Sequence, residues 1–388
     1  TLGSRSILGA NDRVRLGVIG VGEWGQQLIR QALWNDNVEV VAVADVYDAR
    51  HQEVQRLVPG VTAYFDYRSI LDRQDIDAVM IATPLHLHAS QFLDALSAGK
   101  DVYCEKTMAY SIEEAKQCRD AARMSDRIVS IGLQHQSSGW LTDVQQFVTS
   151  GMLGKVTAVE AWKSRKITWV RPVPSDVRPE HVRWEAFLGP APVRPFDPFR
   201  FINWKLYWDY AGGIVTELMV HQVAFILRAL DLPIPETVYA SGGIYVWRDG
   251  REVPDTVSAI MDFPAQGVTV SWTGTLANPF HGIGERYLGT DGTIERLLGA
   301  TNPVTGKVED SLWYYPNRND RLKQPGTTPD VNHVRNFIEC VRSRRTPNAP
   351  VEIGYRSAVT VHMVNLSYRL GRRVRWDPLR EEVIISEA

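Results

Sequence analysis

The chain has 388 residues, of which 44% are apolar and 23% are charged, and its 43 basic residues almost balance its 45 acidic ones. This length accommodates two domains with a sizeable core. The formal charge of −2 argues against a general binder of polyanions, so we expect no nucleic-acid partner. No apolar stretch reaches the roughly 20 residues that span a bilayer. The three cysteines lack CxxC spacing, which is typical of free thiols, and the basic run Arg342, Arg344 and Arg345 is expected on a solvated helix end.

The first third of the chain alternates buried strands with helices. A polar arm (1–12) is expected before the first strand. Strand-like apolar runs follow at 15–20, 38–45, 77–83, 101–106 and 128–134, with helical runs at 26–34, 88–99 and 111–125. Ser111 and Glu114 have the spacing of a capping box. The alternation predicts an α/β fold with a doubly wound parallel sheet, whose ligands bind at the carboxyl ends of the strands.

The segment GVGEWG joins the first strand to the first helix and has the GxGxxG spacing of a dinucleotide site. Gly20 permits a tight turn, Gly22 lets a pyrophosphate approach the backbone, and Gly25 allows close packing of helix on strand. The start of the helix, with Glu23 and Trp24, offers free N–H groups to the phosphates.

Asp45 ends the second strand, 20 residues after the last glycine of this motif. A carboxylate there bonds the adenosine ribose hydroxyls and repels a 2′-phosphate. The next residues, Val46-Tyr47-Asp48, offer no base to hold such a phosphate, so the sequence predicts NAD rather than NADP. Several residues at later strand ends are expected on the cofactor side, with His88 as the candidate for a cofactor or substrate contact. They are Thr83, Pro84, His86, His88, Glu105 and Lys106.

Five motifs, in this order, resemble the Gfo/Idh/MocA oxidoreductases, relatives of glucose–fructose oxidoreductase and inositol dehydrogenase. They are GVIGVGEWG, ATPLHLHA, CEKTMAYSIEEA, GGIVTELMVH and SRRTPNAPVEIGYRSA, and the similarity runs from about residue 13 to about residue 378. The resemblance implies an N-terminal Rossmann domain (13–135) and a C-terminal α/β domain (136–388). The second domain should contain a large, mostly antiparallel sheet with one open face. The resemblance also implies a homodimer or homotetramer formed through that face, and a carbohydrate substrate.

The resemblance assigns roles to two of these motifs. The family's Glu-Lys-Pro matches Glu105-Lys106-Thr107, so Lys106 inherits contacts to the nicotinamide ribose and the reacting hydroxyl. Thr107 replaces the usual proline, which leaves the geometry of the turn open. The family's aspartate and histidine, four residues apart after paired glycines, match Glu217 and His221. His221 inherits the acid/base role, and its acidic neighbour is one methylene longer than usual.

Residues four apart on a helix stack on one face. Glu217 is therefore expected to orient the imidazole of His221 and to raise its pKa toward the working pH. His221 then takes the hydroxyl proton as hydride leaves the same carbon. Two other interpretations stay open. The pair is a buried ion pair that only holds a helix to the sheet, or it ligates a metal, although no spacing marks a third ligand.

The second half of the chain is richer in strands. Residues 156–164 alternate in the manner of a half-buried strand, and a meander of strands follows. The aromatic segment 199–213 leads into the helix of His221, and Trp and Tyr rings stack on the C–H faces of sugars. The substrate candidates lie at the end of the first of these strands and in the aromatic segment. They are Lys163, Arg165, Arg200, Lys205 and Tyr207.

The sequence thus predicts an NAD-dependent oxidoreductase that acts on a ring hydroxyl of a sugar or sugar derivative. One alternative is a glycoside hydrolase on the same fold, which oxidises, eliminates and re-reduces its substrate while NAD stays bound. That route needs a second base, for which Tyr207 and His181 are candidates. Another alternative is a non-catalytic sugar or nucleotide sensor, since Glu217 and Thr107 depart from the family pattern. The polar start resembles that of exported relatives, which leaves the cytoplasm and the periplasm both open.

Overall fold

The computed structural model describes residues 13–385 apart from 302–307, 317, 319, 325 and 327, so the expected arm lies outside the described residues. The first of its two sheets is parallel, with the strand order β3-β2-β1-β4-β5-β6. Its strands are β1 (Val14–Ile19), β2 (Val38–Ala44), β3 (Thr62–Tyr64), β4 (Ala78–Ile81), β5 (Asp101–Glu105) and β6 (Val129–Gly132). The intervening helices are α1 (Glu23–Leu33), α2 (Asp48–Leu57), α3 (Arg68–Leu71), η2 (Leu85–Leu87), α4 (His88–Ser97) and α5 (Ile112–Arg123). This is the strand order of a Rossmann domain, as the βα alternation predicts.

The carboxyl ends of the parallel strands lie along one edge of the sheet. Ile19 of β1 is paired with Ala44 of β2 and with Ile81 of β4. Glu105, at the end of β5, is paired with Gly132 of β6. The loops that follow these strand ends therefore converge, and they carry most of the residues that the sequence assigns to the cofactor.

The second sheet has the order β14-β13-β12-β11-β7-β10-β9-β8-β15-β16 among the described residues. Its first five strands in the chain are β7 (Val156–Ser164), β8 (Thr237–Gly243), β9 (Thr256–Phe263), β10 (Val268–Thr275) and β11 (Ile283–Gly289). The others are β12 (Thr293–Thr301), β13 (Val308–Tyr315), β14 (Leu322–Gln324), β15 (Val374–Asp377) and β16 (Glu382–Ile385). Strands β7 and β10 pair in parallel, whereas the other described pairs are antiparallel. The mostly antiparallel second sheet is thus confirmed.

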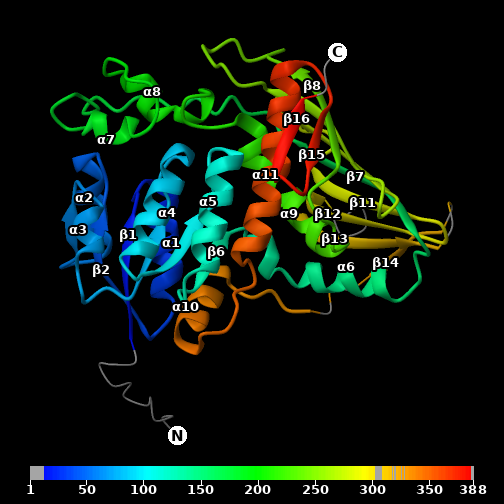
Figure 1. The fold of residues 1–388 in the computed structure, drawn as a ribbon, viewed down its shortest axis with the longest axis horizontal. Coiled ribbons are helices and arrows are strands. Elements are labelled where there is room, and N and C mark those ends of the chain that lie inside the picture. Colours follow the sequence, from blue (N-terminus) through cyan, green and yellow to red (C-terminus); the bar gives the residue numbers. More distant parts are fainter. Residues whose placement is uncertain are drawn as a thin grey trace, which may run out of the picture.

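Helices cover one face of the second sheet and separate it from the Rossmann domain (Figure 1). These helices are α6 (Gly139–Thr149), α9 (Val220–Ala229) and α11 (Val351–Leu370). Phe225 of α9 packs against the guanidinium of Arg296 in β12, for example, 3.6 Å from the ring centroid. On the opposite face Tyr239 and Ile260 are exposed, so this face is open in the single chain. None of the helices in the described residues is long and apolar enough to cross a membrane.

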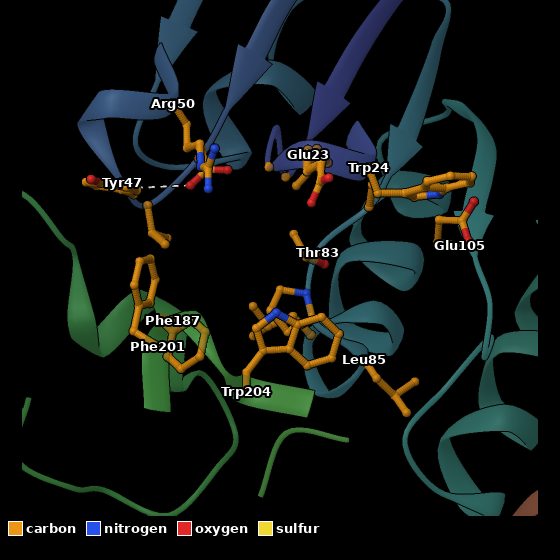
Figure 2. Close-up of a pocket in the computed structure, with 18 of the residues that line it drawn as sticks. Glu23, Trp24, Tyr47, Arg50, Thr83, Leu85, Glu105, Phe187, Phe201 and Trp204 are labelled. Atoms are coloured by element: carbon orange, nitrogen blue, oxygen red, sulfur yellow. Dashed lines mark hydrogen bonds between the residues drawn. The ribbon is translucent and has the colours of Figure 1, made fainter. Parts of the chain in front are cut away.

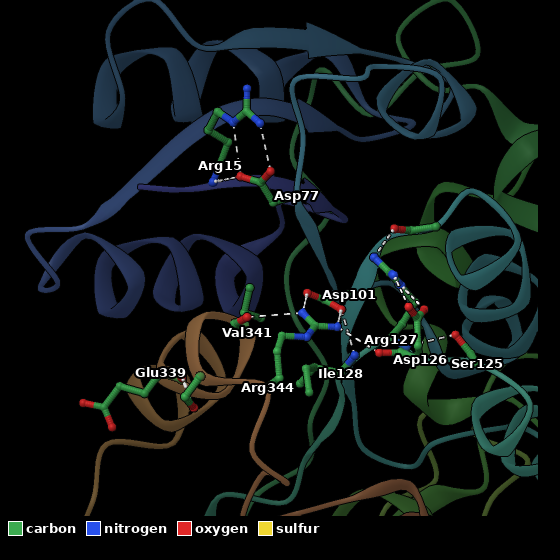
Figure 3. A network of polar contacts seen from close by, with 12 residues as sticks. Arg15, Asp77, Asp101, Ser125, Asp126, Arg127, Ile128, Glu339, Val341 and Arg344 are labelled. Carbon is green, nitrogen blue, oxygen red and sulfur yellow. Dashed lines mark hydrogen bonds and ion pairs between the residues drawn. The ribbon is translucent and has the colours of Figure 1, made fainter. Parts of the chain in front are cut away.

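The chain returns to the Rossmann domain after β14. Helix α10 (His333–Ser343) packs against α1 and β1, and Phe337 contacts the ring of Tyr103 in β5, with 5.7 Å between centroids. Arg344, the next residue after the helix, donates two hydrogen bonds to the carboxylate of Asp101 (2.6 and 3.0 Å; Figure 3). Arg344 is exposed at the end of the helix, as expected for this basic run, and it also pairs with Asp101. A buried Asp101 needs a counter-charge, and this arginine supplies it.

A long connection after β7 extends over the Rossmann domain, and we call residues 169–206 the strap. It contains α7 (Trp184–Leu188), α8 (Pro198–Ile202) and η4 (Trp204–Leu206), and in Figure 1 its two α-helices lie above α2. Val182 forms an isolated antiparallel bridge with Tyr47. Nδ1 of His181 lies 2.7 Å from the carboxylate of Asp48. The strap is thereby attached to the loop that follows β2.

Candidate active site

A cleft of about 1490 Å³ runs between the carboxyl edge of the Rossmann sheet and the strap. It exceeds the roughly 300–1,000 Å³ of most small-molecule sites, which suits a dinucleotide together with a substrate. Figure 2 shows Glu23, Trp24, Thr83 and Glu105 of the Rossmann domain opposite Phe187, Phe201 and Trp204 of the strap. The lining also includes Lys106, Lys205, Glu217 and His221. The predicted cofactor residues and the predicted catalytic residues therefore share one cleft.

The three glycines of GVGEWG differ in what surrounds them. Gly20 has a φ of +82°, which a side chain rarely adopts. A Cβ at Gly25 would lie 2.0 Å from the carbonyl oxygen of Gly20, so α1 packs against the preceding turn without room for a side chain. A Cβ at Gly22 would meet nothing within 4 Å, because this residue faces the cleft. The loop thus leaves space for a pyrophosphate at the start of α1.

Asp45 lies in the cleft beside a basic residue that the sequence analysis missed. Its carboxylate accepts hydrogen bonds from the backbone N–H groups of Val21 (2.8 Å) and Tyr47 (3.0 Å). Burial raises its pKa, although these two bonds oppose the effect. Arg50 also lines the cleft, and it forms an ion pair with Glu53 (2.8 Å). The first turn of α2 brings this arginine back toward the strand end, which the three residues after Asp45 do not reveal.

His88 supports the cofactor loops from within the protein. Its side chain is buried, and its two ring nitrogens each lie 2.8 Å from a backbone carbonyl oxygen, one of Thr83 and one of Thr107. His86 likewise bonds a carbonyl of the strap. Both nitrogens of His88 face carbonyls, so this residue links the loops after β4 and β5; it also lines the cleft, and its contact with a cofactor stays a prediction. Thr83 and Pro84 line the cleft as expected.

Glu105 anchors the loop that carries Lys106. Its carboxylate accepts hydrogen bonds from the amide of Gln134 (3.0 Å), the hydroxyl of Tyr103 (3.2 Å) and the backbone N–H of Lys106 (3.1 Å). Burial raises its pKa. Trp24 lies over Glu105 at this end of the cleft (Figure 2). The position of Lys106 is therefore set by a network that begins in the Rossmann sheet.

The carboxylate of Glu217 lies between two ammonium groups. Its Oε2 is 3.1 Å from Nζ of Lys106 and 3.1 Å from Nζ of Lys205. Burial alone would raise the pKa of Glu217, but the two lysines outweigh it and hold the pKa at about 2. The Lys106–Thr107 peptide bond is cis, and the Thr107 hydroxyl donates to the carbonyl of Thr216 (2.9 Å). The lysine loop is thus attached to the turn of Glu217 by an ion pair and a hydrogen bond.

The helix of Glu217 and His221 contains a π turn, η5 (Val215–Met219), which runs directly into α9. A π turn closes i→i+5 hydrogen bonds, and both side chains line the cleft. No hydrogen bond or ion pair joins Glu217 to His221 among the described residues, so the expected carboxylate–imidazole pair is wrong. Glu217 contacts the lysines, and Nδ1 of His221 has no hydrogen-bond partner within the described part of the chain. Burial, with repulsion from neighbouring cationic groups, lowers the pKa of His221 well below its ordinary value.

The structure separates the substrate candidates of the aromatic segment. Lys205 lines the cleft, with its Nζ 5.3 Å from the ring centroid of Trp204. Arg200 instead binds Glu252 (2.7 Å) and lies 3.8 Å over the ring of Tyr207, which is itself buried in an aromatic cluster. The expected substrate roles of Arg200 and Tyr207 are therefore corrected to structural ones. Trp204 is a lining residue that its aromatic neighbours did not distinguish in the sequence.

Lys163 and Arg165 lie outside the cleft lining. Lys163 is buried on β7, and burial, followed by repulsion from Arg165 and Lys106, lowers its pKa to about 8. His135, just after β6, is a further neighbour that no motif signalled. Its ring lies 5.4 Å from that of His221, and burial lowers its pKa to about 3. Within the described residues, no group of three or more His, Cys, Asp or Glu is arranged to hold a metal ion.

Comparisons with known families agree with this geometry. Residues 14–133 match the oxidoreductase family with an NAD-binding Rossmann fold, and residues 141–295 match the GFO/IDH/MocA C-terminal domain. The chain belongs to the Gfo/Idh/MocA oxidoreductase family. Its Rossmann domain is the NAD-binding domain of that family, and the cleft between this domain and the strap is lined by its glycine-rich loop together with Lys106 and His221.

Two curated relatives of the chain have different names. The rhizopine catabolism protein MocA of Rhizobium meliloti is 28% identical over 151 residues, which cover 39% of this chain and 47% of that protein. The alpha-N-acetylgalactosaminidase of Shewanella oneidensis is 30% identical over 165 residues, which cover 40% of this chain and 36% of that protein. Each match spans less than half of the relative's own length.

Solved structures share the fold over nearly the whole chain. Levoglucosan dehydrogenase in complex with NADH and levoglucosan has a TM-score of 0.72 at 17% identity, and the match covers 94% of this chain and 99% of that one. The WlbA dehydrogenase from Bordetella pertussis, in complex with NADH and UDP-GlcNAcA, has a TM-score of 0.71 at 22% identity, with the same coverage. Both likenesses concern the two-domain architecture.

Proposed function

We propose that this Gfo/Idh/MocA protein oxidises or reduces a ring hydroxyl of a sugar or sugar derivative, with NAD as the hydride carrier. The observation that carries the proposal is the convergence of Lys106 and His221 in one cleft with the NAD-binding loops. Trp204 adds an aromatic surface on the strap side, which suits the C–H face of a sugar. The levoglucosan dehydrogenase with the same fold supports a carbohydrate substrate.

The residues of the chain handle the proton, while bound NAD supplies the hydride acceptor or donor. His221 accepts the hydroxyl proton during oxidation, because its lowered pKa keeps the imidazole neutral at the working pH. Lys106 donates a hydrogen bond to the reacting oxygen and favours negative charge there. Glu217 is a positioning residue: it holds Lys106 and Lys205 in place, and it does not contact His221.

The test is the formation of NADH with free sugars. The protein is incubated with NAD and a panel of hexoses, inositols and sugar acids, and absorbance reports the NADH. We expect NADH to accumulate with at least one of these sugars. The variants Lys106→Met and His221→Asn should form no NADH with the same sugar. A panel that gives no NADH, with a protein that binds NAD normally, would contradict the proposal.

A second candidate is NAD-dependent glycoside hydrolysis, which the strap favours. Transient oxidation, elimination and re-reduction require a nucleotide that stays bound. The strap is tied across the cofactor side of the cleft by the ion pair of Arg171 with Glu23 (2.6 Å) and by the contact of His181 with Asp48 (2.7 Å). This contact places His181 beside α2, so it is a poor candidate for the second base, and His135 is the imidazole next to His221. The Shewanella glycosidase among the relatives supports this candidate.

Aryl glycosides separate the two candidates. A hydrolase releases the aglycone without added NAD and without net NADH, because the hydride returns to the same sugar. A dehydrogenase leaves the aryl glycoside intact or oxidises it with stoichiometric NADH. The measurement is the release of nitrophenol from a set of nitrophenyl glycosides, with and without added NAD, by protein whose bound nucleotide has been quantified.

A further inference from the structure

Trp169, the first residue of the strap, has a backbone conformation that a bulky side chain rarely adopts. Its φ is +68°, in the left-handed region that favours glycine. Three other non-glycine residues of the described chain have a positive φ: Asp231, Arg344 and Glu381. Asp231 and Arg344 follow the ends of α9 and α10, and Glu381 lies in the turn between β15 and β16, where such values are common. Trp169 lies in an irregular connection between β7 and α7, so neither reason applies to it.

Hydrogen bonds on both sides of this tryptophan hold its backbone in place. The residue before it, Thr168, donates its hydroxyl to Asp249 (2.7 Å), and its carbonyl accepts from the buried guanidinium of Arg251. Two residues after it, the backbone N–H of Arg171 donates to the side-chain oxygen of Asn203 (2.7 Å), and the Arg171 carbonyl accepts from the Asn203 amide (3.2 Å). A strained residue persists only where its surroundings fix it, and such residues gather at ligand sites.

The same bonds place the start of the strap beside a residue of the proposed reaction site. Trp169 lines the cleft, as does Lys205. Asn203, which bonds both backbone groups of Arg171, lies two residues before Lys205 in the chain. The ammonium of Lys205 in turn lies 3.1 Å from the carboxylate of Glu217. The start of the strap is therefore fastened to the segment that reaches the catalytic end of the cleft.

Packing accounts for only part of the Trp169 side chain. The residue is partly buried, and it packs against both the main hydrophobic core and the aromatic cluster of the strap. Its remaining surface belongs to the wall of the cleft. Filling space between two clusters does not require a left-handed backbone, whereas aiming a large flat ring at a ligand from a fixed position does require a defined backbone geometry.

We propose that Trp169 is a substrate-contacting residue whose indole face binds the C–H face of a hexopyranose ring next to Lys205. The proposal rests on the proposed function, since it concerns the substrate of the same cleft. Indole has a broad apolar face and a polar N–H at one edge. This shape matches a pyranose ring, which has C–H bonds on its faces and hydroxyls around its rim. An open-chain polyol has the same hydroxyls but no ring face, so Trp169 favours the cyclic sugar.

Calorimetric binding of sugars to the NADH-loaded protein measures this contact without requiring turnover. The probes are glucose, galactose and mannose, with glucitol as the open-chain comparison. We expect at least one hexose to bind wild type more tightly than glucitol does. Trp169→Leu keeps an apolar side chain but loses the aromatic face, and it should bind that hexose about 10-fold more weakly. Trp169→Phe keeps a smaller aromatic face and should lose about two- to threefold. The affinity for NADH should be the same in all three proteins.

Trp247 supplies the matched control. It is also partly buried and packs against the main hydrophobic core, its indole N–H donates to the carbonyl of Leu276 (2.9 Å), and it lies outside the cleft lining. Trp247→Leu and Trp247→Phe should keep the hexose affinity of wild type, even where they lower the Tm. If Trp169→Leu does not fold, Trp169→Phe against Trp247→Phe gives the same comparison, with the two- to threefold loss expected only in the former.

Several results would overturn the proposal. They are the absence of hexose binding by wild type, equal affinity for glucitol and the hexoses, equal hexose affinity in matched Trp169 and Trp247 variants, and equally weak binding by Trp169→Phe and Trp169→Leu. A loss of NADH affinity in Trp169→Leu with unchanged hexose affinity would also do so, because the indole would then contact the nucleotide.

The failure of this proposal is distinguishable from the failure of the proposed function. Hexose binding that Trp169→Leu weakens, without formation of NADH by wild type, would support the contact and contradict the proposed oxidation. Formation of NADH with the same KM in wild type and Trp169→Leu would support the oxidation and contradict the contact.

Discussion

Replacing Glu217 with Gln removes the charge between Lys106 and Lys205 and keeps the shape of the side chain. The lysines hold the pKa of Glu217 at about 2 instead of its ordinary 4.5, which corresponds to about 3 kcal/mol of folding free energy. The side chain of Glu217 is 4% exposed, so solvent screens it little. Breaking a buried pair costs roughly 3–5 kcal/mol. Lys205 is 43% exposed and can turn to water, so we expect a loss at the lower end of this range, about 3 kcal/mol.

The pH dependence gives the same prediction a second readout. Because folding lowers the pKa of Glu217, its stabilisation is complete above pH 4.5 and is lost as the pH falls from 4.5 toward about 2. Between pH 4.5 and about pH 2, the free energy of unfolding of wild type should therefore fall relative to that of Glu217→Gln. The plots of unfolding free energy against pH for the two proteins should converge near pH 2.

Urea unfolding followed by tryptophan fluorescence measures the free energy of unfolding at pH 7 and at several acidic pH values. The control is Glu352→Gln, because Glu352 pairs with Arg123 at 2.8 Å where both side chains are about half exposed (44% and 53%). That pair should contribute less than about 1 kcal/mol. Glu217→Asp keeps the charge and should be more stable than Glu217→Ala. Equal losses in Glu217→Gln and Glu352→Gln would refute the reasoning.

Three further predictions concern the cleft. His221→Ala should abolish turnover and leave NAD binding and folding nearly intact. In wild type the rate of oxidation should persist below pH 6.5, because a base with a lowered pKa stays neutral there. A His221→Ala variant that unfolds and no longer binds NAD would indicate a structural role. Asp45→Ala should weaken the binding of NAD and narrow the preference of the protein for NAD over NADP, because the repulsion of a 2′-phosphate is lost. Titrations of both nucleotides followed by tryptophan fluorescence measure the two affinities. Tighter binding of NADP than of NAD by wild type would contradict the prediction. Arg171→Ala, which breaks the exposed ion pair with Glu23, should accelerate NADH release about two- to threefold in stopped-flow fluorescence. Arg178→Ala, on the same strap but bonded only to the nearby Ser175 carbonyl within the described residues, is the matched control and should release NADH at the wild-type rate.

Short-range patterns were enough to predict the Rossmann domain. The strain at Gly20, the close contact at Gly25 and the strand end at Asp45 each involve a few neighbouring positions. The capping box at the start of α5 is of the same kind, and in the structure Ser111 accepts a hydrogen bond from the backbone N–H of Glu114 (3.1 Å). Such features depend on backbone geometry and on spacing, so the printed sequence contains them nearly complete.

Contacts between distant segments could not be predicted from short-range patterns. Lys106 meets Glu217 across 111 positions, and Arg344 meets Asp101 across 243. Arg200 and Lys205 come from the same basic and aromatic segment, yet Arg200 pairs with Glu252 and Lys205 lines the cleft. No spacing in the chain distinguishes these outcomes, because they depend on which surfaces the packed domains present to one another.

The sequence by itself determined the chemical groups of the site and their local frame: an NAD-binding turn, a lysine after β5, and an acid and a histidine on one helix. Only the tertiary structure decided how these groups are paired. The fold brings Lys106 and Lys205 to the carboxylate of Glu217, and burial lowers the pKa of His221. An acid four residues from a histidine lies within reach of it on a helix, but two ammonium groups supplied by other segments are stronger partners for the carboxylate than a buried, neutral imidazole.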